Sequence, residues 1–207
     1  YGNYVFQPFI DKDTFEKYVT SSKDGEFIMS SWHFESIKNK LALADMMVGQ
    51  YKGRTTQKWV LSSKLEPKDI VKIKGGKVAA ATSDEYSRSV LKKMLGEKGD
   101  LIDSTTILIV PKDMDALMSV IFGLADFALT TENSLDTLGT INKNQYDMFN
   151  KIVKSKDILL PIVAVRSDNP ESVKKLLKIT GEMGNNPEGK KVLKLINIDA
   201  WKWLKGD

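Results

Sequence analysis

A short polar segment between an apolar run and a helical pattern carries side chains that could bind a ligand. It follows residues 77–81 and holds the hydroxyl groups of Thr82, Ser83 and Ser87 together with the Glu85 carboxylate. Hydroxyl groups beside the amides of a helix N-terminus are suited to an anion, whereas Glu85 is suited to an amine. Ser83 as an N-cap and Glu85 as a first-turn acid explain the same residues equally well. The segment therefore predicts either a ligand site or a capped helix start.

Two other polar turns follow apolar runs in the same way. They are Ser30, Ser31 and Trp32 after residues 27–29, and Thr130 and Thr131 after residues 125–129. Ligands of open α/β sheets bind beyond the carboxyl ends of the strands, so both turns are candidate ligand contacts. The alternatives are a helix cap with a packed tryptophan in the first turn, and an ordinary polar turn in the second.

Residue types that common catalytic and metal sites require are scarce. The chain has no cysteine and a single histidine, His33, which argues against thiolate or histidine-rich metal sites and against cysteine nucleophiles. No serine stands in a G-x-S-x-G pattern, and the glycines at 75 and 76 precede a strand rather than a helix. We therefore predict no catalytic residue, no metal ligand and no cofactor.

Charge and hydropathy argue against a nucleic-acid partner and against a membrane-spanning segment. The formal net charge of the 207 residues is +4, but it comes from scattered lysines, and the only arginines are Arg54, Arg88 and Arg166. Nucleic-acid surfaces concentrate arginine with aromatic residues, so we expect no nucleic-acid partner. The longest apolar window is interrupted by Asp115 and Asp126, which predicts a chain that does not itself span a membrane. Because the sequence begins at Tyr1 without a signal peptide, we expect a processed or recombinant chain.

Apolar runs alternate with amphipathic segments along the whole sequence, which is typical of an α/β protein. We predict strands at 4–10, 27–31, 57–63, 77–81, 105–110, 125–130 and 158–165. We predict helices that begin after Asp13, at 34–43, after the segment 82–87, at Asp113, and after the caps Asn169 and Asn186.

Three stretches in this order resemble the phosphate, phosphite and phosphonate-type substrate-binding proteins of ABC transporters. They are Lys74–Ala79 (KGGKVA), Asp115–Ala128 (DALMSVIFGLADFA) and Asn186–Leu193 (NPEGKKVL). The resemblance implies the type II periplasmic binding fold, in which two α/β lobes are joined by two crossing strands. The lobes would be residues 1–71 with 158–207, and residues 72–157. The crossings would be 57–63 and the region 161–165.

The resemblance also implies a site and shows two departures from the family. Family members hold an anion with a Ser-Thr-Ser run, which aligns here with Glu85, Tyr86 and Ser87, so that only Ser87 is retained. A shift of the alignment offers Thr82 and Ser83 instead. A strand and helix that usually open the family's chain do not precede residue 4, so we expect the first sheet to lack a strand.

The expected function is that of a non-enzymatic, extracytoplasmic solute-binding protein of an ABC importer. It would close by a hinge motion on a small polar, anionic, phosphonate-like or phosphate-like solute in the cleft between the lobes, and a membrane permease would recognise the closed form. We expect a periplasmic or otherwise extracytoplasmic location, with membrane association of the full-length form.

Three other functions share features with this one. The same fold serves as the extracellular sensing domain of membrane receptors such as histidine kinases, and as the effector domain of LysR-type regulators. A transmembrane helix with a kinase domain, or a DNA-binding helix-turn-helix, in the flanking sequence would identify these. An enzyme is the weakest alternative, because no acid-base pair occurs at a recognisable spacing.

Overall fold

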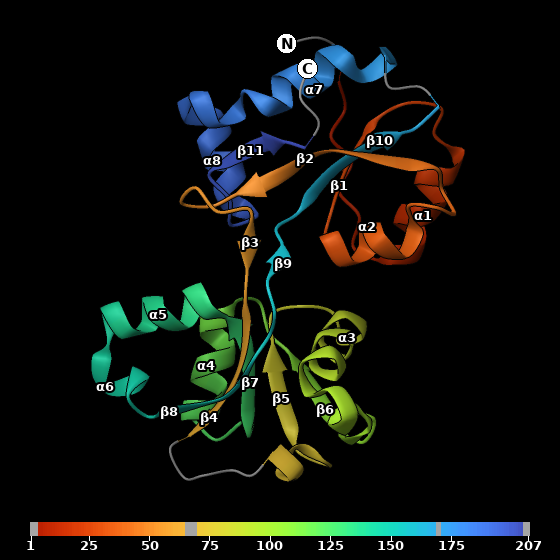
Figure 1. Cartoon of the computed structure of the whole chain (residues 1–207). Coiled ribbons are helices and arrows are strands. Elements are labelled where there is room, and N and C mark those ends of the chain that lie inside the picture. The colour runs from red at the N-terminus through yellow and green to blue at the C-terminus, as the bar shows by residue number, and fades with distance from the viewer. Residues whose placement is uncertain (1–3, 65–69, 169–170, 205–207) are drawn as a thin grey trace. The chain divides into compact units, whose positions relative to one another are not determined.

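The chain forms two compact units (Figure 1). The computed structural model describes residues 4–64, 70–168 and 171–204. Unit 1 consists of residues 1–55 and 159–207, and unit 2 consists of residues 56–158. The chain therefore passes between the units twice. The short strands β3 (Thr56–Gln57) and β9 (Ile158–Leu159) lie at these passages and pair with each other.

Unit 1 is built on a four-stranded antiparallel sheet whose strand order is β1-β10-β2-β11. The strands are β1 (Glu26–Met29), β10 (Ile162–Arg166), β2 (Leu43–Gln50) and β11 (Ala200–Trp203). The apolar run predicted at 158–165 is divided into β9 and β10 around Pro161, which has no N–H to donate to a ladder. Four consecutive residues of β10, from Ile162 to Val165, are buried, as its central position requires.

Helices cover both faces of the unit 1 sheet. They are α1 (Lys12–Ser21), α2 (Ser31–Ile37), α7 (Lys174–Gly181) and α8 (Pro187–Leu195). Phe27 of β1 meets Phe15 of α1 edge to face, with ring centroids 6.3 Å apart. Its neighbour Glu26 interacts with Thr180 of α7. Because successive side chains of a strand point to opposite faces, α1 and α7 lie on opposite sides of the sheet, as Figure 1 also shows.

The predicted N-terminal strand at 4–10 is wrong. Residues 4–9 have no regular structure, Pro8 lacks a donor, and Val5 and Phe6 are exposed rather than buried. The cap of α1 is also two residues earlier than predicted. Asp11 accepts a hydrogen bond from the Thr14 amide at 2.8 Å, so the helix begins before Asp13.

The second helix is shorter than predicted, and a strand follows it. The helix predicted at 34–43 is α2, Ser31–Ile37, and β2 begins at Leu43. The burial pattern of β2 does not alternate, because three half-buried residues are followed by three buried ones, and this hid the strand from the period-two pattern. The predicted cap Asn169 lies outside the described residues. The cap Asn186 is confirmed, because its Oδ1 accepts from the Gly189 amide at 2.7 Å.

Unit 2 contains a mixed five-stranded sheet whose order is β6-β5-β7-β4-β8. The strands are β4 (Trp59–Lys64), β5 (Lys77–Ala80), β6 (Thr106–Ile109), β7 (Phe127–Thr131) and β8 (Phe149–Lys154). The helices are α3 (Asp84–Leu95), α4 (Asp113–Ile121), α5 (Glu132–Ile141) and α6 (Lys143–Tyr146), with 3-10 segments η1 (Ile70–Ile73) and η2 (Gly96–Ile102). Two apolar layers pack on the sheet, one under α3 and one under α4 and α5.

The boundary between the units differs from the expected lobe boundary. Residues 56–71, assigned to the first lobe from the resemblance, belong to unit 2. The reason is that β4 pairs with both β7 and β8 inside the unit 2 sheet. At the second passage the difference is one residue, because unit 2 ends at Ile158.

One edge of the unit 2 sheet gathers three helix starts and both passages. Strands β5, β6 and β7 are parallel, and α3, α4 and α5 follow them, so all three helices begin at the carboxyl edge of these strands. Trp59 at the start of β4 pairs with Thr131 at the end of β7, and Lys154 at the end of β8 pairs with Val60. We call this edge the passage edge.

Glu26 is a carboxyl group held away from water within unit 1. Its Oε2 is buried, and no hydrogen-bond partner for that atom lies within the described parts of the chain. Burial raises the pKa of Glu26 from 4.5 to about 7, and the interaction with Thr180 offsets this only in part. The folded protein therefore holds a proton on Glu26 that the unfolded chain releases at lower pH.

We predict that unit 1 loses stability as the pH rises from about 4.5 to 7, because the unfolded chain ionises Glu26 first. Glu26→Gln should remove roughly 2 kcal/mol of this loss. Urea unfolding at pH 5 and pH 8 measures the difference in the free energy of unfolding between the two pH values. Glu182→Gln, at an exposed position just after α7, is the matched control. An unchanged pH profile in Glu26→Gln would show that the buried carboxyl is not the cause.

Candidate functional site

The start of α3 provides the most accessible of the predicted ligand contacts. Ser83 Oγ accepts from the Tyr86 amide at 3.3 Å, so Ser83 is the N-cap. Ser83 and Glu85 are exposed, and Thr82 is half-buried. Ser83 therefore caps the helix while its side chain stays exposed. Asp84 of the same turn forms an ion pair with Arg88 at 2.8 Å.

The Ser87 hydroxyl is used inside the unit. Ser87 is fully buried, and its Oγ lies 2.7 Å from Thr82 Oγ1 and 3.5 Å from the Thr82 carbonyl oxygen. These contacts tie the turn after β5 to the first turn of α3. The one residue that retains the family's hydroxyl pattern is thus part of the packing of the turn.

Tyr86 contacts the first residue of β4. Its ring meets that of Trp59 edge to face, with centroids 5.9 Å apart and an interplanar angle of 88°. Burial raises the pKa of the Tyr86 hydroxyl above its ordinary value. The Trp59 amide donates to Ser155 Oγ at 2.9 Å, which fixes the two strands that lead to the passages. Sequence reasoning missed Trp59 because it lies inside an apolar run.

The start of α5 is already occupied by a carboxylate of the protein itself. Asp113 Oδ2 accepts from the Thr131 amide and from Thr131 Oγ1, each at 2.8 Å. Thr131 Oγ1 also lies 2.7 Å from Ser134 Oγ. Thr130 is buried, and its Oγ1 has no partner among the described residues. A helix N-terminus favours an anion, and Asp113 supplies it here.

Lysines surround the first residue of α5. Lys154 forms an ion pair with Glu132, and its hydrogen bond lowers the pKa of Glu132. The Glu132 amide donates to the Lys58 carbonyl oxygen at 2.8 Å, and the Lys58 ammonium lies 3.9 Å from Asp157. Lys58 directly follows β3, so the first passage is hydrogen-bonded to the start of α5.

In unit 1 the predicted residues lie at the start of α2. Ser30 Oγ accepts from the His33 amide at 3.2 Å and is the N-cap. Ser31 is buried, and its hydroxyl donates to the Leu159 carbonyl oxygen at 2.7 Å. Trp32 is half-buried, with the Lys12 ammonium 5.9 Å from its ring centroid. The second passage is therefore hydrogen-bonded to the start of α2.

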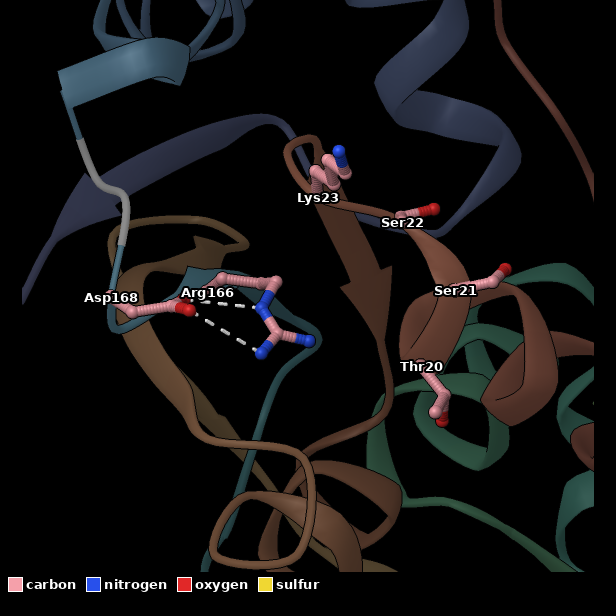
Figure 2. A pocket seen from close by; sticks show the side chains of 6 residues that line it. All are labelled: Thr20, Ser21, Ser22, Lys23, Arg166 and Asp168. Atoms are coloured by element: carbon pink, nitrogen blue, oxygen red, sulfur yellow. Dashed lines mark hydrogen bonds and ion pairs between the residues drawn. The ribbon is translucent and has the colours of Figure 1, made fainter.

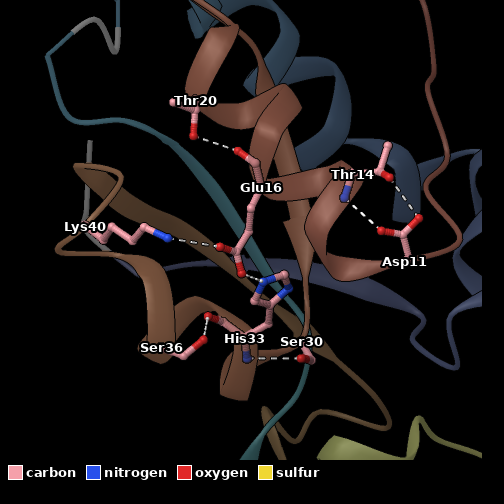
Figure 3. Close-up of polar contacts among 8 residues, drawn as sticks. All are labelled: Asp11, Thr14, Glu16, Thr20, Ser30, His33, Ser36 and Lys40. Carbon is pink, nitrogen blue, oxygen red and sulfur yellow. Dashed lines mark hydrogen bonds and ion pairs between the residues drawn. The ribbon is translucent and has the colours of Figure 1, made fainter.

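Beside Trp32, α2 is joined to α1 by a polar cluster that the sequence analysis did not identify (Figure 3). His33 Nε2 lies 3.1 Å from Glu16 Oε1, and Lys40 Nζ lies 3.5 Å from Glu16 Oε2. Burial acts to raise the pKa of Glu16, but the hydrogen bond from His33 and the charge of Lys40 outweigh it and leave that pKa lowered. A lone histidine gives no sequence signal for such a partner seventeen residues away.

A shallow pocket of about 390 Å³ lies elsewhere in unit 1 (Figure 2). Its lining residues are Thr20, Ser21, Ser22, Lys23, Arg166 and Asp168. Arg166 Nε lies 3.1 Å from Asp168 Oδ1, and this hydrogen bond lowers the pKa of Asp168. The guanidinium is thus partly neutralised. None of the residues predicted as ligand contacts lines this pocket.

We predict that Asp113→Asn destabilises the protein by about 1–2 kcal/mol, because it weakens two charge-assisted bonds at the start of α5. Asp115→Asn, an exposed residue of the same helical turn, should have little effect. Urea unfolding measures both variants. Faster hydrogen exchange of the Thr131 amide in Asp113→Asn alone would show that the loss of stability arises at the start of α5. Equal stability of the two variants would contradict the prediction.

Comparison with known protein families assigns this chain to one of them. A family model described as "ABC transporter, phosphonate, periplasmic substrate-binding protein" matches residues 54–206. No curated protein matches the sequence. Within the described residues, no helix has the length and apolar character needed to cross a membrane.

Three solved structures are similar in fold. XAC2383 from Xanthomonas citri, bound to chloride ion, has a TM-score of 0.69 at 11% identity over 93% of this chain and 76% of that chain. PhnD1 from Prochlorococcus marinus (MIT 9301), in complex with methylphosphonate, has a TM-score of 0.60 at 10% identity over 94% and 77%. The phosphonate-transporter binding protein PA3383 from Pseudomonas aeruginosa has a TM-score of 0.60 at 14% identity over 86% and 63%.

At these identities the structures establish the fold alone, and that fold is the expected type II periplasmic binding fold. The family model is the stronger finding, because it spans most of the chain and includes all three stretches that carry the resemblance. The family consists of substrate-binding proteins, which are non-enzymatic components of transport systems. The chain belongs to the family of periplasmic substrate-binding proteins of phosphonate ABC transporters.

Proposed function

We propose that this chain is the extracytoplasmic solute-binding component of an ABC importer, without enzymatic activity, and that it closes on a small polar, anionic solute. Family membership supports the transport role. The solute would be phosphonate-like or phosphate-like, and the partner that recognises the closed form would be a membrane permease. In the full-length protein we propose membrane association on the outer side.

The observation that carries this proposal is a matching pair of hydrogen bonds, one in each unit. In unit 1, Ser31 at the start of α2 bonds the carbonyl of Leu159. In unit 2, Glu132 at the start of α5 bonds the carbonyl of Lys58. Each passage is thus bonded to a helix start that borders predicted ligand contacts. We propose that the solute binds at the start of α2 and at the start of α3, which shares the passage edge with the start of α5. Binding there would bias the backbone of the passages, which is what hinge closure requires.

We propose that units 1 and 2 are the two lobes of the hinge, and that both contribute contacts. In unit 2 these are Thr82, Ser83, Glu85 and Tyr86 at the start of α3. In unit 1 they are Ser30 and Trp32 at the start of α2. Ser31, Ser87, Thr130 and Thr131 would support the site from behind, because their side chains are buried or already bonded within their own unit.

The charges near α3 narrow the class of solute. The anion position at the start of α5 is filled by Asp113, so we propose that the exposed hydroxyl of Ser83 at the start of α3 contacts the anion. Asp84 and Glu85 lie in that same turn, and Asp84 is paired with Arg88. Glu85 opposes a doubly charged anion and favours a solute of lower charge or one that also carries an amine.

We predict that one solute among methylphosphonate, phosphate, phosphite, sulfonates, amino acids and polyamines raises the melting temperature, because binding to the native state adds stability. Trp32→Ala should weaken binding of that solute by at least about tenfold, because it removes an aromatic contact at the start of α2. Trp203→Ala in β11 is the matched control. Equal effects of the two substitutions on solute affinity would show that Trp32 does not contact the solute.

We further predict that Glu85→Gln strengthens binding of methylphosphonate by about threefold to tenfold, since it removes a like charge near the anion. Glu97→Gln, an exposed position of η2 in the same unit, should leave the affinity unchanged. Isothermal titration calorimetry measures both. Weaker binding of methylphosphonate in Glu85→Gln would contradict this role and would mean that the carboxylate supports the turn.

A further inference from the structure

One side of unit 1 carries a strong excess of positive charge. Helices α7 and α8 contain Lys174, Lys175, Lys178, Lys190, Lys191 and Lys194, and their one acid is Glu188. With the flanking Glu171 and Glu182 included, residues 171–196 hold six lysines and three glutamates, with no arginine or aspartate. On the opposite face of the same sheet, α1 balances Lys12 and Lys17 with Asp13 and Glu16. The excess charge is therefore one-sided.

The lysines of α7 point away from the core. Leu177 and Thr180 form the buried stripe of this helix. Lys174 and Lys178 are one turn apart, Lys175 lies next to them, and all three are exposed. Lys174 is 3.9 Å from Glu171, with both side chains more than three-quarters exposed, so water screens this contact. The outer face of α7 is thus a row of solvated ammonium groups.

The exposed surface of α8 combines lysines with large apolar side chains. Gly189 and Leu193 are buried, whereas Val192, Leu195 and Ile196 at the helix end are 51%, 81% and 37% exposed. Val192 and Leu195 are three residues apart, and Lys191 is four residues before Leu195, so they share one side of the helix. No ion pair involves Lys190 or Lys194 within the described parts of the chain, and Lys191 pairs with Glu188 at 2.8 Å.

Helices α7 and α8 are neighbours in unit 1. The 3-10 segment η4 (Met183–Asn185) joins them, and Gly189 of α8 packs directly on Met183. Leu177 of α7 and Leu193 of α8 belong to the same apolar core. Figure 1 shows the two helices next to each other at the end of unit 1 that holds β11. We call the exposed residues of these two helices and Ile196 the α7–α8 surface.

We propose that the α7–α8 surface binds an anionic lipid membrane. Lysines that flank exposed Leu and Val side chains are the composition of helices that lie at the membrane interface, where ammonium groups meet lipid phosphates and apolar groups enter the headgroup boundary. Lysine, a flexible point charge, suits fluid headgroups better than the fixed carboxylates of a partner protein, which select arginine. The α7–α8 surface would orient unit 1 on the membrane that holds the transporter.

The α7–α8 surface contains none of the proposed solute contacts, so the two proposals can fail separately. A protein that binds vesicles but no solute would leave this inference intact, and a protein that binds solute but no vesicles would overturn it alone. The test uses the unmodified chain in vesicle flotation. The probes are vesicles of phosphatidylcholine and vesicles that also contain about 30% phosphatidylglycerol.

We expect flotation only with the anionic vesicles, and its loss at about 0.5 M NaCl, because salt screens the attraction. The triple variant Lys178→Glu, Lys190→Glu, Lys194→Glu should bind at least about tenfold more weakly. The matched control Lys93→Glu, Lys98→Glu, Lys156→Glu makes the same charge change at exposed sites of unit 2 and should retain binding. Leu195→Ser should weaken binding at low salt.

Three results would overturn the proposal. They are no flotation with anionic vesicles, equal flotation with neutral vesicles, and equal loss of binding in the two triple variants. Circular dichroism of each variant verifies the fold, and Leu195→Ser provides a test without a charge change if the triple variant does not fold. Binding to an acidic protein without binding to vesicles would count against the membrane.

Discussion

The structure depends on the pairing of β10 with β1 and β2. β10 enters unit 1 only after the chain has built the whole of unit 2, yet it is a central strand of the unit 1 sheet. Unit 1 therefore cannot complete its core without two passages. The Gly49 amide donates to the Pro161 carbonyl and the Leu160 amide to the Thr55 carbonyl, at 2.8 and 2.9 Å. These bonds tie the passages to the sheet that they complete.

This constraint explains why the candidate contacts lie near the passages. A parallel arrangement of β5, β6 and β7 brings three helix starts to one edge, and β4 and β8 bring both passages to the same edge. The protein uses one of these helix starts for its own carboxylate, Asp113. At the start of α3, Ser83 and Glu85 are exposed, and we propose that the Glu85 carboxylate limits the negative charge of the solute. In this proposal, the specificity for the solute depends on which helix start the protein fills with its own carboxylate.

Much of the fold could be predicted from local patterns, and the failures have physical causes. Strands with continuous apolar runs, such as β5 and β7, and helices with clear caps, such as α3 and α8, were predicted from sequence. The segment 4–10 has the composition of a strand but no neighbouring strand, and propensity alone cannot supply one. Asp113 and Thr131 are eighteen residues apart, and Ser31 and Leu159 are still farther apart, so only the tertiary fold shows which hydroxyl groups are already bonded.

The central claim is that solute binding changes the distance between units 1 and 2. The chain has no cysteine, so spin labels can be placed uniquely at Asn39→Cys in unit 1 and Lys98→Cys in unit 2, both at exposed positions. Pulsed electron-electron double resonance then measures the distance distribution with and without the solute that raises the melting temperature. We predict a shorter and narrower distribution of distances with solute. A distribution that solute leaves unchanged would contradict it.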